Sequence, residues 1–338
     1  MPMADQGTTR PLRISVGIPT MNNEDSIERM LRQLDEQTRP PDRVIVVDNS
    51  TDATPDIVTE VGDDVEFEVD LYEQSDRGRG VGAARADIYD RFDEDVLACL
   101  DTEHAVDADW LEIHEEFHQS NPGYGILSNS GHPGFDGPVD DPLQSHFFGQ
   151  SNCSLKREAL DATGGWDPWM QRGEDWDLRI RLWTAGVKSW AKHEIAATPF
   201  GQDLASNTMT WFRKKVYHDP SSVTYLRKYG PWYLRFYPLH VAADLLSLVA
   251  VVSLAVVPFG LLVAPLSLVF LLGLPLASAA AFTYYKGPRK RSSLLPRRGE
   301  LSSFLVFFAL GLSVLQNLKR VGGDETWNYQ GFDEAVRR

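Results

Sequence analysis

Four carboxylates are concentrated between Asp101 and Asp109, within the stretch VLACLDTEHAVDADW of residues 96–110. They form two acid-x-acid triplets, Asp-Thr-Glu at 101–103 and Asp-Ala-Asp at 107–109. Paired carboxylate oxygens are hard ligands that suit a divalent cation such as Mg2+ or Mn2+, and such a cation can hold a diphosphate. The stretch is therefore a candidate metal site, and either triplet could supply its ligands.

The elements expected around the two triplets distinguish them. The apolar run VLACL reads as a buried strand that delivers Asp101 at its carboxyl end. Asp107 precedes a helical pattern that starts at Trp110, so we expect Asp107 to be the N-cap, with Asp109 in the first turn beside the helix dipole. We therefore assign the metal to Asp101 and Glu103, against the alternative that these two residues form a solvated loop.

A second group of acidic side chains lies in GGWDPWMQRGEDWDLRIRLWTAG, residues 164–186, beside several tryptophans. Glu174, Asp175 and Asp177 could be the acidic start of a helix. They could equally place a carboxylate in an aromatic-lined cleft, where it would act as a general base toward a hydroxyl nucleophile. The residues alone leave both interpretations open.

Glycine and arginine alternate in QSDRGRGVGAARAD, just before a helix expected over residues 81–92. Backbone N–H groups and guanidinium groups in this pattern predict an anion cradle. The motif does not follow the first strand and lacks the third glycine of GxGxxG, so it is no dinucleotide-binding fingerprint. The residues of the expected cradle are Gly78, Gly80, Gly82, Arg77, Arg79 and Arg85.

Strands and helices are expected to alternate through the first hundred residues. Strands are predicted at 14–18, 43–48, 66–74 and 96–100. Helices are predicted at 24–34 and 81–92, and a further helix is expected to start at Thr54 as its cap, with Pro55 in the first turn. This order predicts an α/β, doubly wound, mostly parallel, Rossmann-like sheet whose ligands lie beyond the carboxyl ends of the strands. Asp48 and Asp101 both occupy such ends, and the Gly- and Pro-rich residues 122–142 are expected to form loops around the site.

The chain has a net charge of −15, and residues 1–238 carry 42 acidic against 23 basic residues. This balance argues against a nucleic-acid partner, which needs a clustered basic face. With 24 Arg against 9 Lys, the acid excess favours a halophilic source. Cys99 and Cys153 are expected to be buried reduced thiols. Residues 1–10 lack the apolar stretch of a secretory signal, so we expect a cytoplasmic catalytic domain.

Residues 239–283 contain one charged residue, Asp244, and are long enough for a transmembrane helical hairpin turning near residues 258–260. The basic loop 284–300 is placed in the cytoplasm by the positive-inside rule. Residues 301–318 are expected to form a third transmembrane helix or an interfacial one, and 319–338 a polar tail. The basic and aromatic residues 211–238 suit the lipid headgroup layer, which leaves 1–210 as the catalytic domain.

Taken in order, four motifs resemble the family 2 glycosyltransferases of the GT-A fold. They are the opening residues 14–54, then GVGAARAD, VLACLDTEH and GGWDPWMQRGEDWDLRIRL. The resemblance covers roughly residues 12–190. It implies a nucleotide-sugar donor, a divalent cation and transfer with inversion at the anomeric carbon.

The resemblance also implies roles for individual residues. Pro19 and Asp48 would contact the nucleotide base, and Arg85 would lie beside the diphosphate. Asp101 and Glu103 would clamp the metal and the diphosphate. Asp175 would be the catalytic base, with Glu174 and Trp176 beside it as substrate-binding residues. Glu103 stands where the family usually has Asp, which lengthens the reach of this ligand.

The acceptor is inferred from what accompanies these motifs. No QxxRW sequence follows them, so we expect the transfer of one sugar rather than processive synthesis. A membrane-held domain suggests a lipid-linked saccharide, for example on dolichol phosphate, as in the N-glycan assembly of archaeal surface-layer proteins. The alternatives are a synthase acting on the bare lipid phosphate, and a sugar nucleotidyltransferase, which would need a basic Gly-rich loop where this chain has PTMNNED.

Overall fold

The computed structural model describes residues 10–78, 80–130, 133–141, 148–149, 152–171, 173–195, 198–199, 222–260 and 311–318. The chain divides into two compact units. The first comprises Met1–Gln202 with Thr326–Arg338, and the second comprises Asp203–Glu325. Each unit is described by itself.

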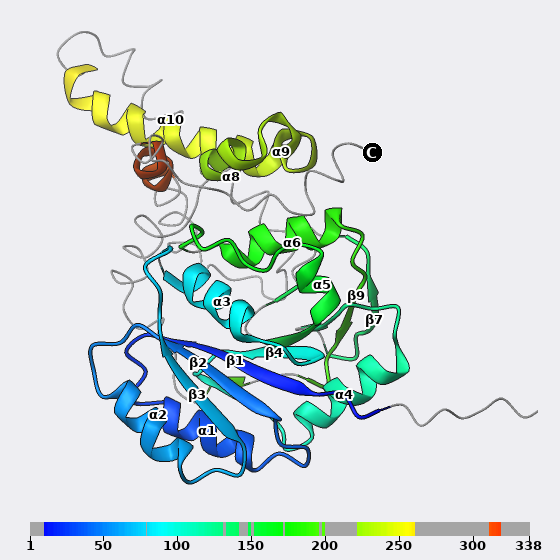
Figure 1. The fold of residues 1–338 in the computed structure, drawn as a ribbon. Helices are drawn as coiled ribbons and strands as arrows, with labels where there is room; N and C mark the ends of the chain where they lie inside the picture. Colours follow the sequence, from blue (N-terminus) through cyan, green and yellow to red (C-terminus); the bar gives the residue numbers. More distant parts are fainter. Residues whose placement is uncertain are drawn as a thin grey trace, which may run out of the picture. The chain divides into compact units, whose positions relative to one another are not determined.

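The first half of the first unit alternates strands and helices in the predicted order (Figure 1). Its elements are β1 Ile14–Thr20, α1 Ile27–Asp35, β2 Arg43–Asp48, α2 Thr54–Gly62, β3 Glu68–Glu73, α3 Gly80–Arg91 and β4 Val96–Leu100. The apolar runs of β1, β2 and β4 are almost entirely buried, and α1 buries one face through residues spaced three or four apart. The periodicity of the sequence therefore located these elements correctly.

The second half adds strands that were not expected. Its elements are β5 His104–Ala105, α4 Trp110–Ser120, β6 Ile126–Asn129, β7 Asp136–Val139, β8 Asn152–Lys156, α5 Arg157–Asp161, α6 Glu174–Thr184, β9 Ser189–Lys192 and β10 Thr198–Pro199. The prediction of loops over residues 122–142 is wrong, since this range contains β6 and β7. Four-residue strands bordered by Gly and Pro have too few apolar positions to show a period.

Eight strands form one sheet in the order β3-β2-β1-β4-β8-β6-β9-β7. The pairs β3–β2, β2–β1, β1–β4 and β6–β9 are parallel, whereas β8 is antiparallel to both of its neighbours and β7 is antiparallel to β9. β5 and β10 form a separate antiparallel pair. The sheet is thus parallel in its amino-terminal half and mixed beyond β4.

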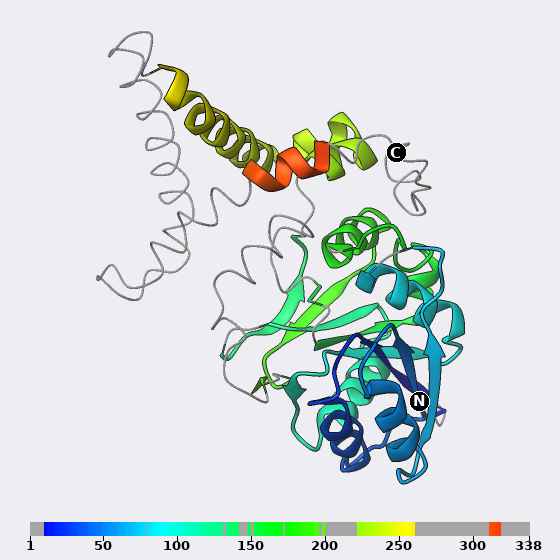
Figure 2. The same ribbon diagram turned by 90° about the vertical axis from the view of Figure 1, so that its left-hand side faces the viewer.

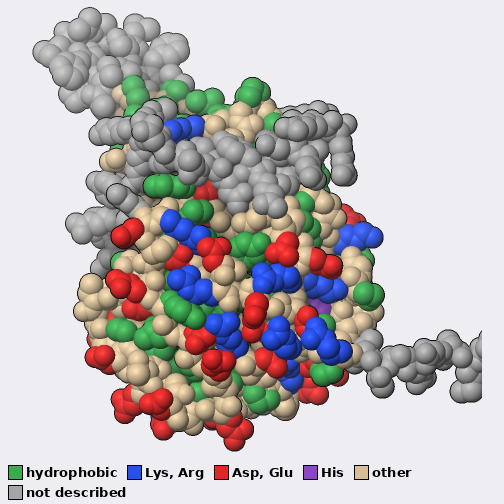
Figure 3. Space-filling model, viewed as in Figure 1, with side chains coloured by type: hydrophobic (Ala, Val, Ile, Leu, Met, Phe, Trp, Pro, Cys, Tyr) green, Lys and Arg blue, Asp and Glu red, His purple; other side chains and the backbone are tan. Residues whose placement is uncertain are grey.

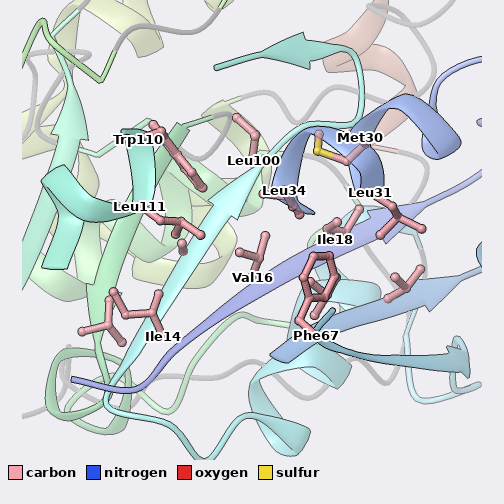
Figure 4. Close-up of a cluster of buried hydrophobic side chains, with 14 of the residues drawn as sticks. Ile14, Val16, Ile18, Met30, Leu31, Leu34, Phe67, Leu100, Trp110 and Leu111 are labelled. Atoms are coloured by element: carbon pink, nitrogen blue, oxygen red, sulfur yellow. The ribbon is translucent and has the colours of Figure 1, made fainter. Parts of the chain in front are cut away.

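Helices cover both faces of this sheet (Figures 1 and 2). Residues alternating along β1 and β4 point to one face, where they form a core with α1, α2 and α4 (Figure 4). The intervening residues of β2 and β4 pack on the other face with α3, α5 and α6. This three-layer arrangement leaves the strand ends open, as in other doubly wound α/β folds.

The acid excess of the first unit is spread over its surface. On the face shown in Figure 3, Asp and Glu side chains are interspersed with Lys and Arg. Many arginines pair with a nearby carboxylate, as Arg39 does with Glu115 at 2.9 Å and Arg32 with Glu28 at 2.8 Å. The Arg32–Glu28 pair is exposed, and ion pairs at such positions stabilise a fold only weakly.

Two helix starts differ from the predictions. The N-cap residue of α4 is Asp109, whose side chain makes no capping hydrogen bond, so the prediction that Asp107 is the N-cap is wrong. The Asp107 carbonyl instead accepts hydrogen bonds from the Trp110 N–H and from the Gln37 side chain, which places the helix start two residues later. Thr54 is likewise the first residue of α2 and not its cap, and its N–H and hydroxyl both donate to Asp52.

One side of α4 docks on β8 through a buried polar cluster. His114 Nδ1 lies 2.7 Å and His118 Nε2 lies 2.8 Å from the Ser154 hydroxyl, and both histidines are buried. One hydroxyl has one proton, so at most one histidine accepts from Ser154 and at least one donates to it. Burial lowers the pKa of His114 to about 3 and lowers the pKa of His118 well below its ordinary value.

These depressed pKa values predict acid sensitivity. Above pH 6.5 both histidines are neutral in the folded and the unfolded chain, whereas below it only the unfolded chain takes up the protons. Stability is therefore expected to fall as the pH drops, by about 2 kcal/mol between pH 7 and pH 5 from His114 and further from His118. Melting temperatures across this pH range should fall more steeply for the wild type than for His114→Asn/His118→Gln. Equal slopes would show that the histidines titrate normally in the folded chain.

The two cysteines lie opposite each other on β4 and β8, in register as Cys99 and Cys153. Both are free and buried, which confirms the prediction of buried reduced thiols. Burial raises the pKa of Cys153 well above its ordinary value, so this thiol is held in its protonated form.

The second unit contains α8 Ser222–Tyr229, α9 Pro231–Phe236, α10 Pro238–Gly260 and a helical segment at residues 311–318. Tyr225, Tyr233 and Tyr237 stack on one another, with ring centroids 5.3 and 4.9 Å apart. All three are buried, as is Tyr229, so four of the five aromatic residues of 211–238 whose burial the structure describes lie inside the unit.

Polar side chains join these helices from within. Asp244, the single charge in the long apolar run, is buried in α10 and accepts a hydrogen bond from the Ser222 N–H at the start of α8. Thr224 of α8 donates to Asn317 over 2.9 Å. The 311–318 helix lies against α10 (Figures 1 and 2), and a Cβ at Gly311 would stand 2.4 Å from the Ser247 carbonyl oxygen.

Among the residues that the structure describes, no helix meets both the length and the apolarity needed to span a membrane. The second helix of the predicted hairpin, the basic loop 284–300 and the tail 319–338 lie outside the described residues, as do 301–310 of the predicted third helix.

Candidate active site

The carboxyl ends of the parallel strands β1, β2 and β4 lie at one edge of the sheet in the first unit. After β1 the chain passes to β2 on one side and later returns to β4 on the other, so β1 and β4 flank a topological switch point. Ligands of open α/β sheets bind at such points. Pro19, Asp48 and Asp101 all stand at this edge, as the sequence predicted.

Asp48 is buried and ties the ends of two strands together. Its carboxylate accepts hydrogen bonds of 2.6 Å from the Thr20 and Ser50 hydroxyls, and one of 3.0 Å from the Ser50 N–H. Pro19, half-buried one residue before Thr20, pairs in register with Val47. A carboxylate oriented by three donors is a rigid acceptor for a further N–H group.

The loops that follow β1 and β2 are linked, and sequence reasoning missed their importance. Asn22 has a left-handed backbone with φ of 57°, its N–H donates to Ser50, and its side-chain oxygen accepts from the Thr51 N–H. Asparagine is among the few non-glycine residues that adopt this conformation readily. Met21, beside it, is 62% exposed. The two adjacent asparagines of PTMNNED could have indicated this left-handed backbone from the sequence.

Arg85 of α3 connects two carboxylates that are distant in the sequence. Its Nη2 lies 3.3 Å from Asp101 Oδ1, and its Nη1 lies 3.5 Å from Glu174 Oε1. Arg85 and Glu174 are both buried, whereas the Asp101 side chain is 42% exposed. Three of the predicted site residues thus meet around one guanidinium group.

The charge state of Arg85 is secured by these neighbours. Burial lowers its pKa, but the charges of Glu174 and then Asp101 raise it further, and the net pKa lies above the ordinary value for arginine. Its buried Nη1 makes no hydrogen bond within the described residues. Arg85 therefore presents a permanent positive charge with donor capacity left for an anionic ligand.

The two acidic triplets have different surroundings. Asp101 directly follows β4 and contacts Arg85, and Glu103 is exposed two residues later. Asp107 and Asp109 are exposed at the start of α4. Within the described ranges, no three His, Cys, Asp or Glu side chains converge into a metal-binding group. Asp101 and Glu103 are thus two ligands at most, and a cation there needs further oxygens from a ligand or from water.

The first turn of α6 presents Glu174, Asp175 and Trp176. Gly173, with φ of 74°, is the N-cap residue, a left-handed conformation that glycine adopts without strain. Asp175 is half-buried, and its Oδ1 accepts a hydrogen bond of 2.7 Å from the Trp176 N–H. The structure thus places Asp175 next to Glu174, the partner of Arg85.

Asp177, two residues further on, has a different environment. It is fully buried and forms an ion pair with Arg181, whose Nη2 lies 2.9 Å from Asp177 Oδ2. Arg181 also donates to the Thr163 and Gly165 carbonyls, both at 2.7 Å. Asp177 is therefore a structural residue, and Asp175 is the half-buried carboxylate of this turn.

The glycines before α3 do not form the predicted anion cradle. A Cβ at Gly78 would stand 2.0 Å from the Pro168 carbonyl oxygen, and one at Gly82 would stand 2.1 Å from that of Met170. The carbonyl oxygens that pack against these glycines would repel an anion. Arg77 is paired with Asp87 and Asp90 instead, and Arg79 lies outside the described residues. Among the described residues of the predicted cradle, Arg85 is the one that contacts Asp101 and Glu174.

The model of the family described as glycosyl transferase family 2 matches residues 15–166. This range contains the strands β1, β2 and β4 and the side chain of Arg85. It also contains Asp101 and Glu103, which we call the clamp carboxylates. Residues 15–166 are therefore similar to a glycosyl transferase family 2 domain, and the chain is a glycosyltransferase. No curated protein sequence matches the chain.

Comparison with solved structures gives several matches. A mannosyltransferase from Pyrobaculum calidifontis, in complex with GDP-mannose and Mn2+, is 19% identical over 92% of this chain and 89% of its own, with a TM-score of 0.54. Residues 1–349 of S. aureus TarS are 14% identical, with coverage of 94% and 99% and a TM-score of 0.49. Glucosyl-3-phosphoglycerate synthase from Mycobacterium tuberculosis is 17% identical, with coverage of 51% and 64% and a TM-score of 0.39. The first of these supports the GT-A fold.

Proposed function

We propose that this chain transfers one sugar, with inversion, from a nucleoside-diphosphate sugar to a lipid-linked saccharide. The observation that carries the proposal is the arrangement around Arg85, which joins Asp101 at the end of β4 to Glu174 at the start of α6. A diphosphate needs a fixed cation, and a hydroxyl nucleophile needs a nearby base. Both requirements are met at the switch point of this sheet.

The chain's own residues would divide the reaction between two parts of the site. Asp48 and Pro19 would bind the nucleotide base, and the buried Arg85 would neutralise part of the diphosphate. Asp175, with Trp176 and Glu174 beside it, would accept the proton of the acceptor hydroxyl as that oxygen attacks the anomeric carbon. The bond to the diphosphate breaks as the new one forms on the opposite face, which inverts the configuration.

The clamp carboxylates fit a divalent cation such as Mg2+ or Mn2+. Asp101 and Glu103 offer accessible, hard oxygen ligands, and the diphosphate would complete the set. When bound, the cation would stabilise the charge on the departing nucleoside diphosphate. The Mn2+ reported with the Pyrobaculum calidifontis mannosyltransferase supports this assignment, as does the position of Asp101 beside Arg85.

The second unit supports a membrane partner because it buries several polar residues while apolar residues of α10 face outward. Inside it, Asp244, Ser247 and Asn317 are buried, whereas the outward apolar residues of α10 are 39–55% exposed. These exposed residues are Leu245, Leu246, Val249 and Val252. Polar interiors and apolar exteriors suit an acyl-chain environment, and so does the close contact at Gly311. We propose that this unit holds the enzyme at the membrane, with the catalytic unit in the cytoplasm.

A membrane location brings the site near acceptors anchored by a polyprenyl chain, and dolichol phosphate is the carrier that we propose. The acidic, Arg-rich composition favours a halophilic archaeon and the assembly of N-glycans for its surface-layer proteins. GDP-mannose in the Pyrobaculum calidifontis structure makes a hexose the first donor to test.

The proposal is tested with the full-length protein in lipid vesicles that contain lipid-linked saccharides extracted from a strain lacking this chain. Mass spectrometry after incubation with Mn2+ and each common nucleotide sugar should find one lipid-linked species that is one sugar longer. Vesicles containing only polyprenyl phosphate distinguish the bare phosphate as acceptor. Extension of the bare phosphate alone would refute the saccharide acceptor.

The same assay tests the clamp carboxylates. A chelator should abolish transfer, and Glu103→Gln should reduce it by about 10²-fold because the amide oxygen is a weaker, neutral ligand. Asp109→Asn is the matched control, since Asp109 is an equally exposed acid of the competing triplet. If the Asp109 change abolishes metal-dependent transfer while the Glu103 change does not, the wrong triplet has been assigned.

A further inference from the structure

Glycines bring one loop into direct backbone contact with α3. The approach loop, defined here as residues 165–171, leads from α5 toward the first turn of α6. At Gly78, an added Cβ would stand 2.0 Å from the Pro168 carbonyl oxygen, and at Gly82 it would stand 2.1 Å from that of Met170. No side chain fits at either position unless the loop moves.

The contact extends along one face of α3. Gly82, Arg85 and Tyr89 are spaced three and four residues apart, so they share that face. The aromatic ring of Tyr89 lies under Gly165, where a Cβ would stand 2.3 Å from Cδ1. Arg85, between the two contacts, reaches Glu174 just beyond the approach loop.

The approach loop is itself well ordered by its own contacts. Trp166, Asp167 and Met170 are buried. The Asp167 carboxylate accepts from the Trp169 N–H at 2.9 Å, and its carbonyl accepts from the Met170 N–H at 3.1 Å. A loop held in this way moves as a unit, so its distance from α3 determines where α6 begins.

We infer that Gly78 and Gly82 are positioning residues of the active site. Because they have no Cβ, the approach loop can touch the backbone there. This contact sets the distance of Glu174 and Asp175 from Arg85 and from the clamp carboxylates. The role given to Asp175 rests on the proposed function, whereas the packing itself does not. This positioning role also accounts for Gly78 and Gly82, which do not form an anion cradle.

The expected effect is large because the distances are short. Ordinary contacts of a Cβ begin at 3.4 Å, so an alanine at position 82 would push the Met170 carbonyl away by about 1 Å. A displacement of about 1 Å can cost an enzyme about 10²-fold in rate. Alanine is also the better helix former, so helix propensity alone predicts no loss of α3.

The test compares Gly82→Ala with Gly123→Ala in the full-length protein. A Cβ at Gly123 would meet nothing within 4 Å, so this variant controls for the substitution itself. Hydrogen exchange with Mn2+ and GDP or UDP present should rise in peptides covering residues 165–177 of Gly82→Ala and stay unchanged in β1 and β2. Turnover with the donor that the wild type uses should fall at least tenfold, while the affinity for the nucleoside diphosphate should change less than twofold.

Wild-type exchange and turnover in Gly82→Ala would overturn the inference. So would a parallel loss of nucleotide affinity with raised exchange throughout the sheet, because that result indicates general destabilisation. If Gly82→Ala does not fold, Gly78→Ala repeats the test outside the helix, against Pro168. If the wild type transfers no sugar from any nucleotide donor, the proposed function fails, and the exchange pattern still decides the packing role.

Discussion

Replacing Asp175 with Asn is expected to reduce sugar transfer by about 10³-fold, because an amide cannot take the proton of the acceptor hydroxyl. The substitution preserves size, and the amide oxygen can still accept from the Trp176 N–H as Asp175 Oδ1 does. Asp175 is half-buried and has no part in the Asp177–Arg181 ion pair. Stability should therefore change by less than about 0.5 kcal/mol.

This expectation is checked by measuring transfer rates and the affinity for the nucleoside diphosphate with the same preparation. Pro19 and Asp48, which are expected to bind the nucleotide base, lie on β1 and β2, so nucleotide affinity should be retained. A variant that transfers at the wild-type rate would show that another group takes the proton. A variant that loses nucleotide binding as well would place Asp175 in donor recognition.

The same substitution two residues further on should have the opposite outcome. Asp177→Asn leaves the fully buried Arg181 without its counter-ion, and breaking a buried pair in this way costs about 3–5 kcal/mol. Arg181 also holds the Thr163 and Gly165 carbonyls, so the start of the approach loop should loosen with it. Asp177→Asn should unfold at a clearly lower temperature or urea concentration than Asp175→Asn.

A double variant refines this second prediction. Asp177→Asn/Arg181→Met removes both charges, and replacing a buried ion pair by apolar groups is often nearly neutral. Stability should recover only in part, because the Thr163 and Gly165 carbonyls lose their donor. If the single Asp177→Asn variant is as stable as the wild type, the ion pair contributes nothing that a neutral amide cannot replace.

The sequence predicted the first half of the sheet because β1, β2 and β4 are apolar runs whose burial follows from their own residues. It missed β6 and β7, since strands of four residues owe their existence to partners far away in the chain. The position of Asp101 at the carboxyl end of a strand followed from the apolar run before it, whereas the switch point became visible only in the folded sheet. These outcomes separate what local periodicity determines from what long-range pairing determines.

The candidate site divides in the same way. Asp101, Glu174 and Arg85 could each be selected as motif residues, but only the folded chain shows that one guanidinium group joins them. The glycines around position 80 suggested an anion site because a sequence shows residue types and not their neighbours. Asp177 could not be told from Asp175 by sequence, because both are acids in the same turn and only one is buried.

The antiparallel strand β8 in the middle of the sheet has a consequence for biosynthesis. Its residues pair with those of β4 that lie 52 to 60 positions earlier, from Leu100 with Asn152 to Val96 with Lys156. Until residue 156 has left the ribosome, β4 presents an unpaired edge of five apolar residues, the kind of edge that promotes aggregation. The nascent chain therefore passes through a vulnerable interval that ends when β8 is added, and folding of this unit is governed by that late, long-range pairing.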